Sequence, residues 1–198
     1  MSDDSEFARL VTLACHDLRT PLATVHGFAT TLAHGGGLEP PADRYVEMID
    51  AASAQLAELI DELSLAARIE SGRYDPTPHE ADTLELTRAA AARLGEDRVR
   101  VTGSGAKLET DADSVERGLA ALFQSALRHG GLDSVEVEVA GAEIRLSRVT
   151  PASAPVVLGD DLRDLGAAVA VLLVRRLGGS VAIDGETLVI RLRHEPGE

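Results

Sequence analysis

Hydrophobic residues recur at spacings of three and four along two stretches in the first third of the chain. In the first stretch they lie at Phe7, Val11, Ala14, Leu18, Leu22, Val25, Ala29 and Leu32. In the second they lie at Tyr45, Ile49, Ala52, Leu56, Leu59, Leu63 and Ala66. This spacing places each set on one stripe of a helix. The sequence therefore predicts two long amphipathic helices.

Glycine and proline residues separate these two helices. The run from His34 to Gly37 is expected to stop the first helix, and Pro40, Pro41 and Asp43 are expected to start the second. Two striped helices with a short connection form an antiparallel hairpin. Little else in this part of the chain could cover the two stripes, so pairing of two hairpins into a four-helix bundle is the simplest way to bury them. We expect a homodimer.

The pattern changes after Gly72, where a proline-containing linker at 74–78 precedes alternating helical and strand-like segments. Helices are predicted over 84–94, 113–128 and 162–177, the last ended by Gly178 and Gly179. Strands are predicted over 99–102, 135–139, 144–149, 181–183 and 188–192, with hairpin turns at Gly141 and at 184–185. The fold class is therefore a helical hairpin forming a dimeric bundle, at 1–72, followed by an α+β sandwich at 73–198 with helices on one face of a mainly antiparallel sheet.

Composition narrows the possible functions. The chain has 198 residues with a formal net charge of −14, which argues against nucleic-acid binding because that requires a clustered basic surface. The first residues lack the basic and apolar regions of a signal peptide, and the longest apolar run, 167–174, is too short to span a membrane. We expect a cytoplasmic protein without membrane contact. Cys15 is the only cysteine and is interpreted as a small buried hydrophobe.

One face of the first helix carries candidate chemistry. His16 lies about 200° around the helix from both Ala14 and Leu18, so its ring is predicted to face water. A neutral imidazole is a nucleophile near pH 7, and Asp17 could hold its tautomer. The Thr20 hydroxyl, one turn further on, could orient a water molecule. Pro21 leaves the carbonyl of Asp17 without its helical donor and is expected to bend the helix.

The run His-Asp-Leu-Arg-Thr-Pro-Leu at 16–22 resembles, at every position, the H-box of sensor histidine kinases. Residues 66–73 look like that family's exit from its dimerisation and histidine-phosphotransfer domain into its catalytic domain. The resemblance implies that His16 accepts a phosphoryl group, that Asp17 acts as its base, and that Thr20 supports dephosphorylation of the partner. Arg19 and Pro21 are expected to contact that partner, a response-regulator receiver domain.

The second domain resembles the kinase ATP-binding domain in outline but departs from it where the family binds nucleotide. The family's N-box asparagines correspond to Ala121 and Ser125, and a serine hydroxyl would leave Mg²⁺ short of a ligand. Its aspartate-glycine segment falls at 148–152, where Arg148 offers only hydrogen-bond donors to adenine. Asp164 replaces a glycine before the third predicted helix and places an anion where phosphate would bind.

Three further residues of this domain match the family pattern without requiring a ligand. Gly178 and Gly179 are explained by a helix stop, and His129 by packing at a helix end. Gly166 is also kept. The stretch before the third helix is short, which leaves little for an ATP lid. We therefore expect no cofactor bound by this chain and no use of ATP.

Three functions remain open. In the first, a histidine phosphotransferase, His16 passes a phosphoryl group between receiver aspartates and the receiver supplies its own Mg²⁺. This resembles the bundle-forming phosphotransferases that retain a degenerate kinase domain. The second is a sensor histidine kinase with an unusual ATP site, which the intact H-box favours. The third is a non-catalytic adaptor or phosphatase of a response regulator, in which Thr20 is active and His16 is a relic.

Overall fold

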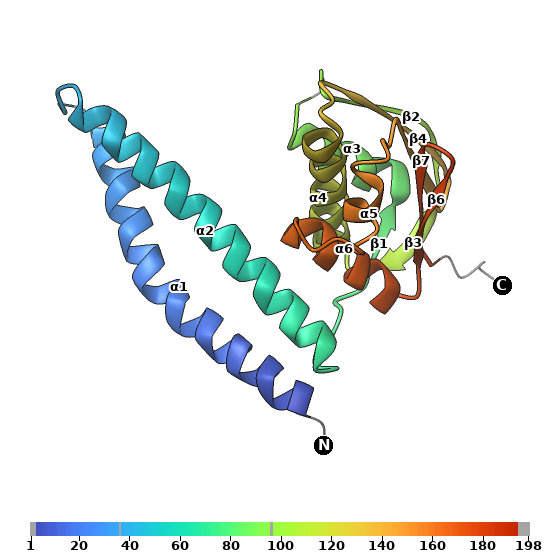
Figure 1. Cartoon of the computed structure of the whole chain (residues 1–198), viewed down its shortest axis with the longest axis horizontal. Helices are drawn as coiled ribbons and strands as arrows, with labels where there is room; N and C mark the ends of the chain where they lie inside the picture. The colour runs from blue at the N-terminus through green and yellow to red at the C-terminus, as the bar shows by residue number, and fades with distance from the viewer. Residues whose placement is uncertain (1–2, 36, 96, 194–198) are drawn as a thin grey trace. The chain divides into compact units, whose positions relative to one another are not determined.

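A computed structural model shows a chain made of two compact units, Met1–Tyr74 and Asp75–Glu198. It describes residues 3–35, 37–95 and 97–193, and the side chains of residues 3–7, 9 and 10 lie outside this description. Figure 1 draws the first unit in blue to blue-green and the second in green to red. Each unit is described by itself.

The first unit is the predicted helical hairpin. Helix α1 spans Asp3–Gly35 and α2 spans Ala42–Glu70, and the two run side by side (Figure 1). Gly36, part of the predicted turn, lies outside the described residues. Pro21 is accommodated inside α1, which continues past it to Gly35.

Small side chains close this hairpin. The buried residues on its inner faces are Ala8, Cys15, Ala29, Ser53 and Ala67. Cys15 is 1 % exposed and free, which confirms its interpretation as a small buried hydrophobe. Small residues let two helix backbones approach closely. The half-buried Leu22 and Ile60 continue the same seven-residue repeats, so the contact between α1 and α2 is built mainly from small side chains.

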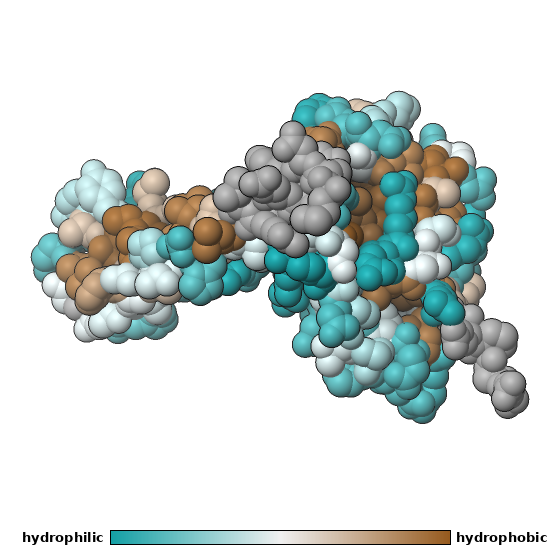
Figure 2. All heavy atoms as spheres, turned by 90° about the horizontal axis from the view of Figure 1, so that it is seen from below, coloured by the Kyte–Doolittle hydropathy of each residue, from teal (hydrophilic) through white to brown (hydrophobic). Residues whose placement is uncertain are grey.

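The large apolar side chains of the hairpin point away from this contact. The exposed ones are Leu13, Leu18, Val25, Phe28, Leu32, Tyr45, Met48, Ile49, Leu56, Leu59 and Leu63. Most of them form the stripes predicted from the sequence, and Figure 2 shows hydrophobic residues along the surface of the hairpin. Three members of the predicted α1 stripe are corrected, because Ala29 is buried and Val11 and Leu22 are half-buried. Phe28, which the predicted stripe did not include, is exposed, and the side chain of Phe7 lies outside the described residues. Steps of three and four fit both faces, so the spacing alone did not separate them.

The second unit contains a five-stranded sheet in the order β2-β4-β5-β7-β6. Strand β2 (Val99–Gly105) pairs parallel with β4 (Val135–Gly141), and the remaining pairs, made by β5 (Glu143–Ser147), β7 (Thr187–Arg191) and β6 (Ser180–Asp184), are antiparallel. This agrees with the predicted, mainly antiparallel sheet. A separate two-stranded sheet joins β1 (His79–Asp82) to β3 (Lys107–Thr110), and neither strand was predicted.

Helices α3 (Thr83–Ala92), α4 (Ala112–Gly130) and α6 (Leu165–Arg176) cover one face of the five-stranded sheet (Figure 1). Alternate strand residues point into this layer, as in β4, where Val135, Val137 and Val139 are buried. Phe123 of α4, fully buried, is the largest side chain of this core. The predicted helix-on-sheet layer is therefore confirmed.

The boundaries of the third predicted helix need a correction. Helix α6 begins at Leu165 instead of at 162, because the side chain of Asp164 caps it by accepting a hydrogen bond from the Ala167 amide at 3.1 Å. Leu162 is 78 % exposed and belongs to the preceding turn. A short helix that was not predicted, α5 (Ala154–Val157), also occupies this connection. The C-terminal stop is confirmed, since Gly178 follows the helix with φ of +82°.

The face of the sheet opposite the helices carries a network of ion pairs. Arg145 of β5 donates to Glu143 at 3.0 Å and to Asp184 of β6 at 3.0 Å, while Arg191 of β7 donates to Glu143 at 2.7 Å. The hydrogen bond from Arg145, with the nearby charge of Arg191, lowers the pKa of Glu143. The network therefore joins three neighbouring strands, with Glu143 linking β5 to β7 and Arg145 linking β5 to β6.

We predict that Glu143→Gln lowers the free energy of unfolding more at pH 7 than at pH 3. A carboxylate whose folded pKa is lowered contributes stability above its unfolded value of 4.5, and this contribution is lost as the pH falls through the folded value. Urea unfolding followed by circular dichroism measures both pH values. Glu186→Gln, at the exposed β6–β7 turn, is the matched control. If Glu143→Gln lowered the free energy of unfolding by the same amount at pH 7 and at pH 3, the prediction would be contradicted.

Candidate functional site

The candidate phospho-acceptor His16 lies on the water-facing side of α1. Its side chain is 77 % exposed, and Nδ1 lies 3.2 Å from Oδ1 of Asp17. The predicted exposure is therefore confirmed. If Nδ1 carries the ring proton and donates it to Asp17, the lone pair of Nε2 points away from that carboxylate. The local geometry suits attack by Nε2 on an electrophilic phosphorus atom.

Thr20 and Pro21 follow on the same helix and are both exposed. Thr20 lies four residues after His16, so the two side chains share one flank of α1. The Thr20 carbonyl accepts the hydroxyl of Thr24 at 3.2 Å. The positions required for the roles that the resemblance implies are thus all accessible from water.

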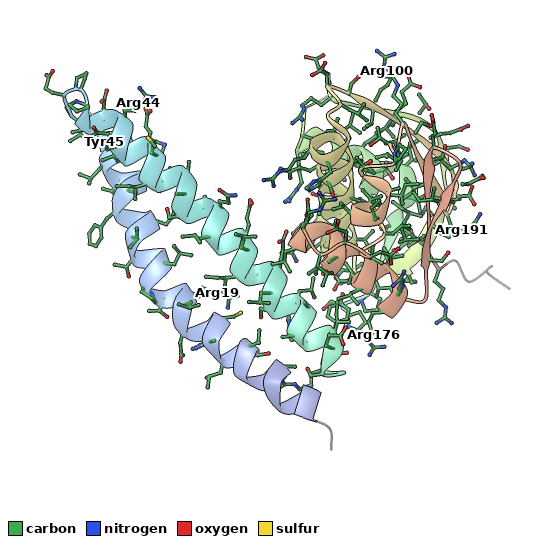
Figure 3. All side chains as sticks on the ribbon, viewed as in Figure 1. Arg19, Arg44, Tyr45, Arg100, Arg176 and Arg191 are labelled. Atoms are coloured by element: carbon green, nitrogen blue, oxygen red, sulfur yellow. The ribbon has the colours of Figure 1, made fainter. Side chains whose placement is uncertain are left out.

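Arg19 is turned toward α2 instead of toward the flank of His16. Its guanidinium donates to Asp61 of α2 at 2.6 Å, with both side chains about half exposed. Figure 3 shows the labelled Arg19 between the two helices of the hairpin. This ion pair links the two helices about one turn of α1 C-terminal to the candidate phospho-acceptor His16. Any contact of Arg19 with a partner would therefore compete with this ion pair.

A second polar contact links the helices, and the sequence analysis did not find it. It joins His26 and Thr30 of α1 to Asp50 and Ser53 of α2. The i, i+4 and i, i+3 spacings of these four residues were visible in the sequence. Their pairing was not, because it depends on which faces of the two helices meet.

The positions that correspond to the family's N-box lie on α4. Ala121 packs partly buried against the core, and Ser125 is fully buried. Among the residues that the structure describes, the Ser125 hydroxyl has no hydrogen-bond partner. An amide at this position could reach further than a hydroxyl, and the buried serine offers a single short oxygen to a metal.

A hydrogen bond joins Asp164, at the start of α6, to His129 of α4. Nε2 of His129 lies 3.1 Å from Oδ2 of Asp164, and the side chains are only 17 % and 15 % exposed. The other oxygen of Asp164 caps α6. The sequence predicted that His129 only packs at a helix end. The structure shows that it also contacts Asp164. The anion-binding end of α6 is occupied by the protein's own carboxylate.

Arg148, at the position expected to read adenine, is exposed and has φ of +72°. A residue with a Cβ atom adopts this left-handed conformation at a cost in energy. The next residue, Val149, is fixed because its amide donates to the carbonyl of Glu186 at 2.8 Å. Nothing in the sequence indicated this backbone conformation.

Within the described ranges, no group of three histidine, cysteine, aspartate or glutamate side chains is arranged to hold a metal ion. A cavity of about 430 Å³ opens in the second unit between the β1–β3 sheet and the C-terminal end of α6. It is lined by Lys107, Glu109, Val174 and Leu192 among others, and none of the predicted site residues lines it.

Residues 8–72 match the His Kinase A (phospho-acceptor) domain family. The hairpin therefore matches the phospho-acceptor domain of histidine kinases, and this match supports the resemblance of the chain to that family. No helix in the described parts of the chain is both long and apolar enough to cross a membrane.

Two curated relatives are similar over part of the chain. One is an uncharacterized sensor-like histidine kinase of Rhizobium meliloti (strain 1021), 28 % identical over 153 residues, which are 70 % of this chain and 29 % of that protein. The other is the sensor histidine kinase TrcS of Mycobacterium tuberculosis (strain ATCC 25618 / H37Rv), 31 % identical over 88 residues, 44 % of this chain and 16 % of that protein. The chain thus spans less than a third of the length of either relative.

Solved structures confirm the fold. Full-length ShkA, in complex with AMPPNP, is 17 % identical with a TM-score of 0.68, covering 92 % of this chain and 44 % of that one. The Acinetobacter baumannii histidine kinase AdeS is 17 % identical with a TM-score of 0.53, covering 90 % of this chain and 98 % of that one. A helical hairpin followed by an α+β domain of the kinase type is therefore the fold of this protein.

We predict that Asp164→Ala lowers the free energy of unfolding by about 1 kcal/mol or more, because it removes the cap of α6 and the carboxylate that pairs with His129. Asp164→Asn keeps an oxygen acceptor for the cap and should lose less. Urea unfolding of both variants measures the difference. Equal stability of the alanine variant and the parent protein would show that the pair does not hold this end of α6.

Proposed function

We propose that this protein is a histidine phosphotransferase that carries a phosphoryl group on His16 to or from receiver-domain aspartates. The observation that carries the proposal is the exposed imidazole of His16, held through Nδ1 by Asp17, within a phospho-acceptor hairpin. The proposed partner is a response-regulator receiver domain, and the proposed location is the cytoplasm.

The reaction follows from this geometry. Nε2 of His16 attacks the phosphorus atom of a receiver aspartyl phosphate, a P–N bond forms, and the P–O bond to the aspartate breaks with its electron pair. The imidazolium that results keeps its proton on Nδ1, where the Asp17 carboxylate stabilises the charge. The reverse step passes the phosphoryl group to a second receiver aspartate. In this proposal the receiver brings the Mg²⁺ and this chain binds no cofactor.

The residues of the second unit do not fit a bound nucleotide with Mg²⁺. Ser125 is buried and offers one hydroxyl, Asp164 occupies the anion-binding end of α6, and exposed Arg148 brings only donors. These departures favour a phosphoryl source other than ATP. No step is therefore assigned to this unit.

A sensor kinase is the second candidate, and the similarity to proteins described as sensor histidine kinases favours it. The related ShkA was solved in complex with AMPPNP. In that case His16 would receive its phosphoryl group from a nucleotide. A phosphatase or adaptor, in which the exposed Thr20 orients the attacking water molecule, is the third.

We further propose that two copies of the chain pair through the exposed stripe of their hairpins. Leu18 and Val25 of α1, with Leu56 and Leu63 of α2, are each 41–55 % exposed and repeat every seven residues. Seven-residue repeats are the pattern that packs helices in bundles. His16 lies on the opposite side of α1 from Leu18, about 160° away measured by the shorter way around the helix. A bundle formed through this stripe would therefore leave the imidazole accessible.

We predict that the full chain takes an acid-labile phosphoryl group from a ³²P-labelled receiver domain and that His16→Ala removes most of this label. Incubation with labelled ATP and Mg²⁺ should leave the parent chain unlabelled. Both results are read by gel autoradiography. His34→Ala, an exposed histidine on the same helix, is the matched control and should retain the label.

Two outcomes would contradict this prediction. Labelling of His16 by ATP would favour the sensor kinase. Release of inorganic phosphate from the receiver without label on the chain, abolished by Thr20→Ala, would favour the phosphatase.

For the assembly, we predict that the parent chain has about twice its 20.8 kDa mass in solution and that Leu56→Glu weakens the dimer about 100-fold or more. The reason is that two carboxylates would enter one apolar stripe. Size-exclusion chromatography with light scattering measures the mass across a dilution series. Gln55→Glu adds the same charge at the neighbouring exposed position and should leave the dimer intact. A monomeric parent chain would refute the proposed bundle.

A further inference from the structure

A second imidazole of the hairpin is held as firmly as that of the candidate phospho-acceptor. Nδ1 of His26 lies 3.1 Å from Oδ1 of Asp50 and 3.1 Å from Oγ of Ser53. The hydroxyl of Thr30 donates to the same Asp50 oxygen at 2.5 Å. We refer to these four side chains as the His26 cluster.

The hydrogen bonds of the His26 cluster fix the tautomer of the ring. Ser53 donates its hydroxyl proton to the backbone carbonyl of Asp50 at 2.9 Å, so its oxygen is an acceptor toward His26. The carboxylate of Asp50 is an acceptor as well. Both neighbours of Nδ1 therefore require a proton on that nitrogen. In the neutral ring, the lone pair is then left on Nε2.

Water reaches the other edge of this ring. Ser53, on the Nδ1 side, is 2 % exposed, whereas the His26 side chain is 42 % exposed. Because Nδ1 is engaged by two partners, Nε2 is the ring nitrogen left to meet water. His26 also lies about 100° around α1 from Val25 and 80° from Leu18, members of the exposed apolar stripe. Pairing of two hairpins through that stripe would leave this edge open.

We propose that His26 is a second phosphoryl-accepting histidine of this hairpin. This inference rests on the proposed function, because it assigns the same chemistry to another residue. Nε2 attacks the phosphorus atom of an acyl phosphate, a P–N bond forms, and the carboxylate leaves with the electrons of the broken P–O bond. The imidazolium keeps its proton on Nδ1, and the adjacent Asp50 carboxylate stabilises the positive charge.

The chain contains a matched comparison for this argument. Nδ1 of His34, eight residues further along α1, donates to the backbone carbonyl of Thr30 at 2.8 Å. The His34 ring is thus held in the same tautomer and is exposed, but a neutral oxygen replaces the carboxylate. A hydrogen bond to a charged acceptor is about twice as strong as one to a neutral acceptor. Phosphorylation, which makes the ring cationic, should therefore favour His26 over His34.

The experiment uses the full-length His16→Ala chain and potassium phosphoramidate at pH 8, a donor that phosphorylates imidazole directly. In this reaction the P–N bond to ammonia breaks, ammonia leaves after taking up a proton, and the new bond forms to the ring nitrogen. Tandem mass spectrometry under neutral conditions locates the added phosphoryl group at each time point. The parent chain, treated in parallel, reports on His16, and circular dichroism checks the fold of each variant.

We expect His26 to be labelled about tenfold faster than His34 in the His16→Ala chain. His16→Ala combined with Asp50→Asn should bring the rate at His26 down to that at His34, since it keeps an acceptor and removes the charge. A ³²P-labelled receiver domain that transfers to His16 in the parent chain should then label His26 in the His16→Ala chain.

Equal labelling of His26 and His34, or an unchanged rate after Asp50→Asn, would overturn the inference. Transfer from the receiver to His16 but never to His26 would also overturn it and leave the proposed function standing. Transfer to neither histidine would overturn the proposed function itself.

Discussion

Each helix of the hairpin carries two stripes that repeat every seven residues, and one partner helix can cover only one of them. The stripe of small residues, with Cys15 and Ala29 on α1 and Ser53 on α2, is buried between the two helices. The large apolar side chains are left on the outside. Small residues give a close backbone approach and little apolar area, so the hairpin leaves uncovered the side chains that would contribute most to burial. Whatever covers the outer stripe must come from beyond these two helices.

This division of the helix surface also decides where chemistry can occur. One flank of α1 packs on α2 and a second carries the exposed apolar stripe, whereas His16 lies on the remaining flank at 77 % exposure. A nucleophile on a packed flank would be sterically blocked, whereas on this flank it is presented to water by a helix that is held against α2. Rigid presentation of this kind is what phosphoryl transfer requires of a protein.

Periodicity and one short motif were enough to predict the hairpin, the layered second unit and the exposure of His16. The pattern could not show which of two similar stripes closes the hairpin, since Leu22 and Phe28 fit steps of three and four equally well. Contacts between distant residues were also beyond its reach. The pairs Arg19–Asp61 and His129–Asp164 join separate helices, and their partners are defined only by the fold. Strands β1 and β3 were missed because each of them contains a single apolar residue, which gives no alternation to recognise.

The two units differ in what they need from outside the chain. At the start of α6 the unsatisfied backbone amides require an acceptor, and Asp164 supplies it while its second oxygen lies 3.1 Å from Nε2 of His129. The open face of the sheet is likewise covered by the chain's own ions, through Glu143 and Arg145. These interactions are complete within one chain, so the second unit requires no ligand at either place. In the hairpin, by contrast, the large apolar side chains of the outer stripe are exposed. If two copies pair through this stripe, as proposed above, the stability of the hairpin should depend on protein concentration.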